Sequence, residues 1–193
     1  MPPRGIEAVA IGASAGGVEA LSVLLPALPA TLHAALFIVV HLPRERPSLL
    51  AGIFKDRCAL AVREAEDKEP VVPGTVYFAP PDYHLLVDVG PCLALSADDF
   101  VNYSRPSIDV LFESAADVYG ERLMGVVLTG GNSDGTAGLA AIQAAGGTAV
   151  VQDPQEAKAP FMVNSALARV RADHVLPLAD IAALLRSLAA REG

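Results

Sequence analysis

Ser14 stands in the segment of this chain that is best suited to covalent chemistry. Gly12 and Gly16 flank it, which is the G-x-S-x-G spacing of a nucleophilic serine at a sharp strand-to-helix turn. Glycines let the backbone bend and leave room for a substrate carbonyl to approach the serine Oγ. The helix that follows would point its N-terminal N–H groups at the place where negative charge develops during acyl transfer. The pattern therefore favours a nucleophile for acyl transfer.

The same segment has two other interpretations. Gly12, Ser14 and Gly17 occupy the three positions at which dinucleotide-binding turns carry glycine, although the middle residue here is serine. The next predicted strand ends in His41 and not in the acidic residue that such folds place about 20 positions on, and the absence of G-K-[ST] excludes a P-loop. Ser14 could also be a helix N-cap. From this motif alone, the nucleophile, the phosphate cradle and the cap all remain open.

Two further residues that can do chemistry follow predicted strands. His41 comes directly after the apolar run 35–40, and Asp134 follows the run 123–128 by a short turn. Parallel strands end at one edge of a sheet, where α/β folds build their sites, so we expect both side chains to converge with Ser14. Imidazole can take the serine proton near neutral pH, and a carboxylate orients the imidazole. Taken alone, His41 could be an ordinary polar residue and Asp134 a helix N-cap. Together they favour a Ser-His-Asp triad, in an order that differs from that of the α/β-hydrolases.

The elements that must position these residues alternate between strands and helices. Continuous apolar runs, such as 35–40, are typical of parallel strands that are buried on both faces, and helical periodicity, as in 108–119, marks the helices between them. This alternation predicts an α/β fold with a doubly wound, mostly parallel sheet flanked by helices, and the Pro- and Gly-rich middle predicts a short antiparallel β insertion. The predicted strands are 7–11, 35–40, 61–64, 75–79, 84–88, 93–95, 123–128, 148–152 and 174–176, and those from 61–64 to 93–95 form the antiparallel insertion. The predicted helices are 16–25, 48–54, 108–119, 136–145, 161–170 and 178–191.

The composition narrows the class of protein. The 193 residues are 52% hydrophobic and 19% charged, which predicts one globular catalytic domain over residues 1–193. The net charge of −8 and the lack of a basic run argue against nucleic-acid binding. Cys58 and Cys92 form no C-x-x-C pair, and the sequence shows neither a signal-peptide pattern nor a membrane span, so we expect a cytoplasmic protein. The four histidines lack metal-ligand spacing, and we expect neither a metal nor a cofactor.

Seven motifs follow one another along nearly the whole chain, from about Val9 to the C-terminal helix. They are residues 11–17 (IGASAGG), 40–43 (VHLP), 64–67 (EAED), 73–84 (PGTVYFAPPDYH), 105–112 (RPSIDVLF), 127–130 (VLTG) and 133–138 (SDGTAG). In this order and at these spacings, the chain resembles the catalytic domain of the protein-glutamate methylesterases of bacterial chemotaxis, the CheB family.

The resemblance implies that Ser14 is the nucleophile, His41 the general base and acid, and Asp134 the orienting carboxylate. It implies hydrolysis of glutamate 5-O-methyl esters on chemoreceptors with release of methanol, and many members of the family also deamidate receptor glutamines. We expect backbone N–H groups of Ala15 and of the Gly130-Gly131 turn to hold the oxyanion, because these residues are expected beside the serine.

Arg44, Arg46 and Arg105 stand out because the protein is otherwise acidic. A methylated receptor helix is also acidic, so these side chains are candidates for steering or contacting the substrate. The alternative is a set of solvated surface charges.

The chain departs from the family pattern in three places. Family members usually carry a phosphorylatable receiver domain ahead of this region, whereas this sequence starts directly at the catalytic domain. We therefore expect no receiver domain here, either because the sequence is an excised piece or because the protein stands alone, and a separate receiver protein is a candidate regulator. Gly131 stands where the family usually has Met, and Met162-Val163 stands in place of Met-Pro. The expected partner is a methyl-accepting chemoreceptor or a similar methylated protein. A serine esterase or amidase acting on another protein, and a non-catalytic binding module, remain the alternatives.

Overall fold

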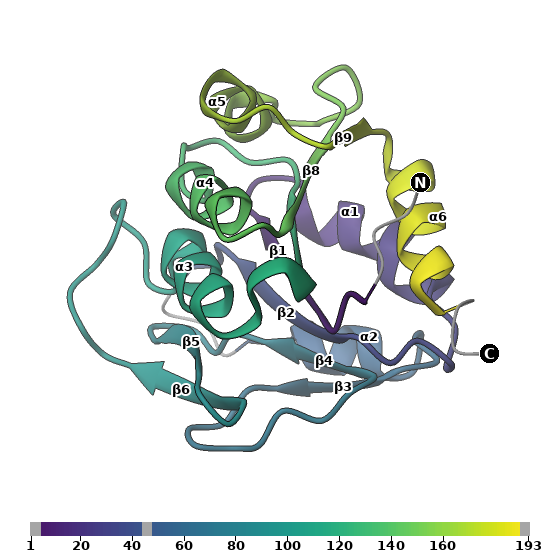
Figure 1. Ribbon diagram of the computed structural model, residues 1–193, viewed down its shortest axis with the longest axis vertical. Coiled ribbons are helices and arrows are strands. Elements are labelled where there is room, and N and C mark those ends of the chain that lie inside the picture. Colours follow the sequence, from purple (N-terminus) through teal and green to yellow (C-terminus); the bar gives the residue numbers. More distant parts are fainter. Residues whose placement is uncertain (1–4, 44–47, 190–193) are drawn as a thin grey trace.

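A seven-stranded sheet with the order β3-β4-β2-β1-β7-β8-β9 forms the centre of the molecule (Figure 1). The computed structural model describes residues 5–43 and 48–189. All neighbouring strands of this sheet run parallel. The strands are β1 (Ala8–Ala13), β2 (Ala35–Val40), β3 (Ala61–Glu64), β4 (Thr75–Phe78), β7 (Leu123–Val127), β8 (Thr148–Gln152) and β9 (His174–Leu176). Two more strands, β5 (His84–Asp88) and β6 (Cys92–Ser96), form an antiparallel hairpin.

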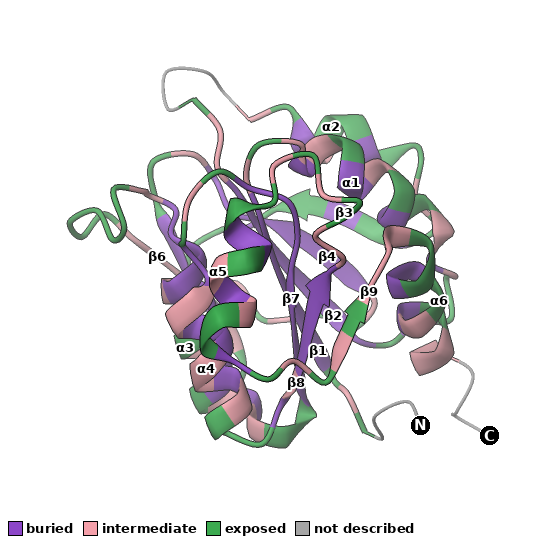
Figure 2. Cartoon of the chain, turned by 90° about the horizontal axis from the view of Figure 1, so that it is seen from above, coloured by how far each residue is buried: buried purple, intermediate pink, exposed green. Residues whose placement is uncertain are grey.

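Helices cover both faces of the sheet, which confirms the predicted doubly wound α/β architecture (Figures 1 and 2). The helices on one face are α3 (Ile108–Tyr119), α4 (Thr136–Ala144) and α5 (Phe161–Arg169). Those on the other face are α1 (Gly17–Leu24), α2 (Leu50–Lys55) and α6 (Leu178–Ala189). The short 3₁₀ turns η1 (Leu25–Ala27) and η2 (Gly120–Arg122) follow α1 and α3. Most predicted elements agree with these bounds to within one or two residues, and the predicted helical residues 190 and 191 lie outside the described part of the chain.

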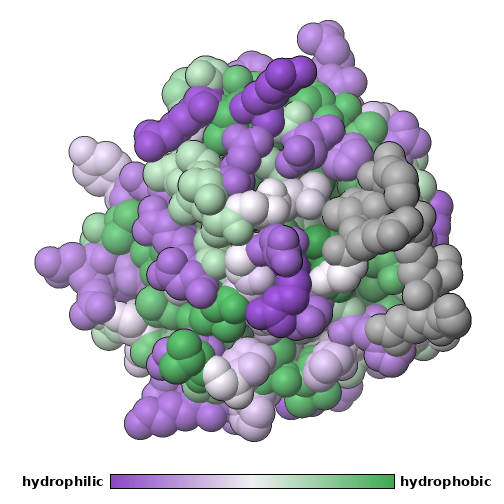
Figure 3. All heavy atoms as spheres, viewed as in Figure 1, coloured by the Kyte–Doolittle hydropathy of each residue, from purple (hydrophilic) through white to green (hydrophobic). Residues whose placement is uncertain are grey.

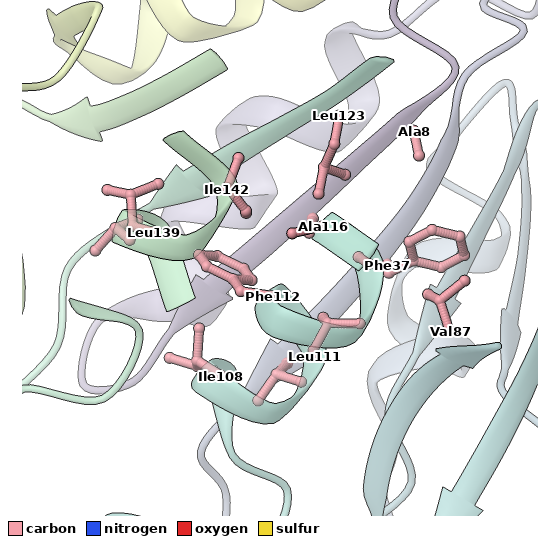
Figure 4. Close-up of a cluster of buried hydrophobic side chains, with 14 of the residues drawn as sticks. Ala8, Phe37, Val87, Ile108, Leu111, Phe112, Ala116, Leu123, Leu139 and Ile142 are labelled. Atoms are coloured by element: carbon pink, nitrogen blue, oxygen red, sulfur yellow. The ribbon is translucent and has the colours of Figure 1, made fainter. Parts of the chain in front are cut away.

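The strands form two cores because alternate residues point to opposite faces of the sheet. In β1, Ala8 and Ala10 belong to the core under α3, whereas Val9 and Ile11 belong to the core under α1. Every residue of β1, β2, β4 and β7 is buried, as the continuous apolar runs predict. Figure 4 shows Phe112 of α3 lying between the sheet and α4. Burial of a side chain of this size stabilises the fold by about 1.5–3 kcal/mol.

One prediction about the middle of the chain is wrong. The segments 61–64 and 75–79 were expected in an antiparallel insertion, but β3 and β4 pair in parallel, with Val62 opposite Val76, and β4 pairs in parallel with β2. The turn residues in the connection 65–74 mark its end but carry no information about strand direction, and this connection is long enough to return to the same end of the sheet. Among the named strands, only β5 and β6 are antiparallel.

The order of the strands places the candidate residues together. The chain passes from β1 to β2 on one side and later enters β7 on the other side of β1, so β1 lies at the point where the direction of winding reverses. Ligands of open α/β sheets bind outside the carboxyl ends of the strands at such a point. Ser14 follows β1, His41 follows β2 and Asp134 follows β7, so all three lie at this edge.

On the face of the molecule in Figure 3, hydrophilic and hydrophobic side chains alternate in small groups. None of the helices in residues 5–43 and 48–189 combines the length and the apolar character needed to cross a membrane.

Candidate active site

Ser14 lies in a three-residue turn between β1 and α1, as the G-x-S-x-G spacing predicts. Its backbone N–H donates to the Thr129 carbonyl at 3.0 Å, and its carbonyl accepts the N–H of Gly17 at 2.8 Å. Gly16 has a φ of 81°, and a Cβ at this position would come within 3.1 Å of the Thr129 side chain. Glycine is therefore required for the bend that presents Ser14 at the end of its strand.

Gly130 lets a second loop approach the serine. A Cβ at Gly130 would lie 3.0 Å from Ser14 Cβ and 2.5 Å from Met162 Cε. Met162 lies in the first turn of α5, and its N–H donates to the Gly130 carbonyl at 3.0 Å. The Met162-Val163 departure from the family pattern thus falls within a regular helix that begins directly after Pro160.

His41 lies beside Ser14 because their strands are in register. Ala13 is paired with Val40, and the His41 N–H donates to the Ala13 carbonyl at 3.1 Å. The imidazole Nε2 of His41 lies 2.8 Å from Asp134 Oδ2. The His41 side chain is 13% exposed and that of Asp134 is fully buried, so the imidazole reaches solvent while the carboxylate does not.

The carboxylate of Asp134 is surrounded by donors. Oδ2 also accepts the N–H of Ile108 at 2.7 Å, at the N-terminus of α3. Oδ1 accepts hydrogen bonds from Asn102 Nδ2 at 2.8 Å, Ser107 Oγ at 2.8 Å and the Asp109 N–H at 3.1 Å. Burial opposes ionisation of Asp134, but these bonds and the one from His41 outweigh it, so the pKa of Asp134 is lower than its ordinary value. Asp134 is therefore an anion that can hold an imidazole.

These contacts determine the tautomer of His41. An ionised carboxylate only accepts hydrogen bonds, so Nε2 of the neutral ring carries the proton and Nδ1 is an acceptor. Nδ1 lies 3.1 Å from Asn132 Nδ2, which is a donor. Both ring nitrogens are thus engaged. In the described part of the chain, Ser14 Oγ makes no hydrogen bond to the His41 ring.

A second carboxylate, Asp109, lies behind the first. Asp109 Oδ1 accepts the N–H of Gly138 at 2.6 Å, and Oδ2 accepts Asn102 Nδ2 at 2.7 Å. Burial, together with the nearby negative charge of Asp134, raises the pKa of Asp109 in spite of these bonds. Asn102 thus connects the two carboxylates.

His84 and Arg105 hold the loop that carries Asn102. His84 Nδ1 accepts the N–H of Ser107 at 3.1 Å, and its Nε2 lies 2.9 Å from the Asp99 carbonyl. Arg105 donates twice to Asp82 Oδ1 and once to each of the carbonyls of Ala97 and Asp98. Its guanidinium also lies 4.6 Å from the centre of the Phe100 ring. Most donors of Arg105 are therefore used within the protein.

A hollow of about 140 Å³ opens beside His41 and is lined by Leu42, Tyr103, Ser104, Arg105 and Pro106. A larger hollow of about 320 Å³ lies at the opposite, amino-terminal ends of the strands, where Glu7 and Tyr119 line it. Because parallel sheets build their sites at the carboxyl edge, the smaller hollow is the candidate for substrate entry. Within the described residues, no group of three or more His, Cys, Asp and Glu side chains is placed to hold a metal ion.

The structure brings together Ser14, His41 and Asp134 from three remote parts of the sequence, with the Gly130 turn against the serine. Arg44 and Arg46 lie outside the described residues. Sequence reasoning missed Asn132, although a polar residue after β7 is the same signal that identified Asp134. It also missed Asn102 and Asp109, which follow no strand of the main sheet and carry no comparable local signal.

Comparisons with known proteins agree with this geometry. The family described as CheB methylesterase matches residues 9–185. A relative from Leptospira interrogans is 46% identical over 178 residues, which cover 92% of each chain. The protein-glutamate methylesterase/protein-glutamine glutaminase 2 of Caulobacter vibrioides is 38% identical over 192 residues, or 97% of this chain and 55% of that protein.

A solved structure extends the likeness to three dimensions. The crystal structure of the CheB methylesterase catalytic domain of Thermotoga maritima superposes with a TM-score of 0.90 at 35% identity, and the match covers 95% of this chain and 98% of that one. With a family match over most of its length, this chain belongs to the CheB methylesterase family.

Proposed function

We propose that this chain is a serine hydrolase that cleaves glutamate 5-O-methyl esters of chemoreceptors and releases methanol. The observation that carries the proposal is the 2.8 Å hydrogen bond between His41 and the buried, ionised Asp134, beside a serine on a strand-to-helix turn. A helix N-cap would not need a carboxylate bound to an imidazole from another strand. Relatives named as protein-glutamate methylesterases support the substrate class.

The reaction begins at Ser14. His41 Nε2 is held by Asp134, so Nδ1 is the nitrogen that takes the Ser14 proton as Oγ attacks the ester carbonyl. The proton then passes to the methoxy oxygen, methanol leaves, and a glutamyl-enzyme remains. Water, deprotonated by the same nitrogen, attacks this ester and regenerates Ser14. Asp134 stabilises the imidazolium in both steps.

The backbone supplies the donors for the oxyanion. The Gly130 N–H donates to the Ala159 carbonyl at 2.9 Å, so it is already used. In the described part of the chain, no acceptor takes the N–H of Ala15 or Gly131, and both residues are exposed at the surface. We therefore assign the oxyanion to Ala15 and Gly131. Glycine in place of methionine at position 131 leaves this backbone donor available.

The same machinery accepts a glutamine side chain, because attack on an amide differs only in the leaving group, which becomes ammonia. Relatives whose names include protein-glutamine glutaminase support this second substrate. Arg44 and Arg46, which follow His41 within five residues of the sequence, are candidates for steering chemoreceptor helices rich in acidic residues. Arg105 is assigned to holding the loop 97–105, since its donors are engaged there.

The cellular compartment is inferred from the proposed substrate. We place the chain in the cytoplasm, where receptor methylation sites are exposed and where thiols such as the free Cys58 and Cys92 stay reduced. It acts as one catalytic domain, and a separate receiver protein is a candidate regulator.

The test is methanol release from methylated receptor membranes. Ser14→Ala should abolish release and should also abolish labelling by a fluorophosphonate, with an unchanged circular dichroism spectrum. Full residual release by this variant would contradict the proposal. Labelling at Ser14 without methanol release would point to an esterase with another protein substrate, and neither activity in the native protein would point to a binding module.

A further inference from the structure

The acceptor nitrogen of the general base is occupied by a residue outside the Ser-His-Asp set. His41 Nδ1 lies 3.1 Å from Asn132 Nδ2, while the same asparagine accepts the Asp134 N–H through Oδ1 at 3.0 Å. The second bond determines the orientation of the amide, because only one arrangement lets Oδ1 face an N–H and Nδ2 face the ring. Asn132 is thus a donor to His41.

A ring nitrogen of neutral imidazole has one lone pair in the ring plane. Since Nε2 is bound to Asp134, Nδ1 is the one nitrogen of His41 that can receive the Ser14 proton. As long as Asn132 donates to this lone pair, Ser14 cannot. Asn132 and Ser14 therefore compete for the same atom.

The surroundings of Asn132 allow it to leave. Its side chain is half-buried, and its neighbours Gly131 and Ser133 are exposed. A Cβ at Gly131 would have no heavy atom within 4 Å apart from its chain neighbours, so the residue before Asn132 has open space beside it. Asp134 itself is anchored by its own bonds to α3 and does not depend on Asn132 for its position.

We propose that Asn132 is a positioning residue that holds the imidazole of His41 with its Nδ1 occupied and must release it before Ser14 can be activated. The proposal rests on the proposed function for its kinetic consequence, but the contact itself can be tested without any activity. Removal of the amide should free Nδ1 and speed the first step, whereas a residue needed for the chemistry would slow it when removed.

The direct test is the ¹⁵N resonance of His41 Nδ1 in histidine-labelled protein, assigned with His41→Gln. Asn132→Ala should move this resonance, because a hydrogen bond to the nitrogen is lost, and Ser14→Ala should leave it in place. The matched control is Asn164→Ala, which removes an exposed amide from α5 and should have no effect. A resonance that responds to Ser14→Ala and not to Asn132→Ala would overturn the proposal.

The kinetic test is the rate at which a small fluorophosphonate labels Ser14. Loss of one competing neutral hydrogen bond should raise this rate about three- to tenfold in Asn132→Ala. Asn132→Gly provides a second variant in case the first folds poorly, and Asn164→Ala should label at the native rate. An unchanged or slower rate in a folded Asn132 variant contradicts the proposal. If the native protein does not label at all, the proposed function fails, and the resonance still decides the role of Asn132.

Discussion

Asn102 Nδ2 lies 2.7 Å from Asp109 Oδ2 and 2.8 Å from Asp134 Oδ1, so one amide group joins two carboxylates behind the candidate active site. Two neighbouring negative charges repel each other, and the surroundings favour ionisation of one carboxylate over the other. The pKa of Asp134 is lowered and that of Asp109 is raised. The amide of Asn102 donates to both carboxylates and favours the ionised form of each, including the Asp134 charge that faces His41.

Asn102→Gly should lower both stability and activity. The residue has a φ of 53°, which glycine adopts without strain, so the variant isolates the loss of the amide. Hydrogen bonds to charged groups contribute about 1.5–3 kcal/mol, and we expect a loss of about 1–2 kcal/mol in urea unfolding because the site is partly exposed. The matched control is Lys68→Gly, at an exposed residue that also has a positive φ, 63°, and it should not lower stability by a comparable amount. Equal losses in the two variants would argue against the bridge.

Asp134→Asn should destabilise the protein most at neutral pH. The folded-state pKa of Asp134 is lowered, so its carboxylate contributes stability above the unfolded pKa, and this contribution disappears as the pH falls through the folded pKa. We expect a deficit of about 2–4 kcal/mol at pH 7, because breaking a buried charged network costs that much. Urea unfolding of native and variant protein between pH 7 and the acid limit should show the deficit shrinking. A deficit that is constant over this range would contradict the assignment.

Asp109→Asn should have the opposite dependence on pH. Its pKa is raised in the folded protein, so the ionised form costs stability, and this cost sets in as the pH rises through the unfolded and then the folded pKa. Relative to native protein, the variant should therefore gain stability with rising pH across this range. The same urea unfolding series measures both variants. If the stability of Asp109→Asn and Asp134→Asn relative to native protein changed with pH in the same way, the opposite pKa shifts of the two carboxylates would be contradicted.

Gly138→Ala should force α3 and α4 apart. An added Cβ would lie 2.5 Å from Phe112 Cβ and 3.0 Å from Asp109 Cα, where neither neighbour can move without shifting the helix. Overpacking of this kind costs about 1–3 kcal/mol and should lower the melting temperature. Gly52→Ala is the control, since it lies in α2 with no heavy atom within 4 Å of the added Cβ, and it should raise stability by up to about 1 kcal/mol. A melting temperature for Gly138→Ala at or above the native value would refute the close packing.

Arg105→Lys should loosen the loop 97–105. Lysine keeps the charge but cannot make two bonds to Asp82 and two to backbone carbonyls at once. We expect faster amide exchange in 99–104 and a loss of about 1–2 kcal/mol. Arg122→Lys is the matched control, because its side chain is 45% exposed against 18% for Arg105 and its ion pair with Glu7 is at the surface. If amide exchange in Arg105→Lys were as slow as in the native protein, Arg105 would not be needed to hold the loop, and a role in contacting the substrate would be favoured.

Sequence patterns were sufficient for the local architecture around the serine. The G-x-S-x-G spacing predicted a strand, a turn and a helix at Ser14, and the buried runs predicted β2 and β7, because period and glycine placement are local properties of the backbone. Because the carboxyl ends of parallel strands share one edge of the sheet, the sequence also predicted that His41 and Asp134 lie close to Ser14.

Only the tertiary structure decided the direction of β3 and β4 and the partners of each side chain. Strand direction depends on the end of the sheet to which each connecting segment returns the chain, and the local sequence of a strand does not encode that path. Likewise, which nitrogen of His41 faces Asp134 depends on ring orientation, and the contacts of Asn132 and Asn102 depend on loops that meet across more than 20 residues of sequence. Residue types thus determined which chemistry is available in this chain, whereas long-range packing determined which atom of each residue can perform it.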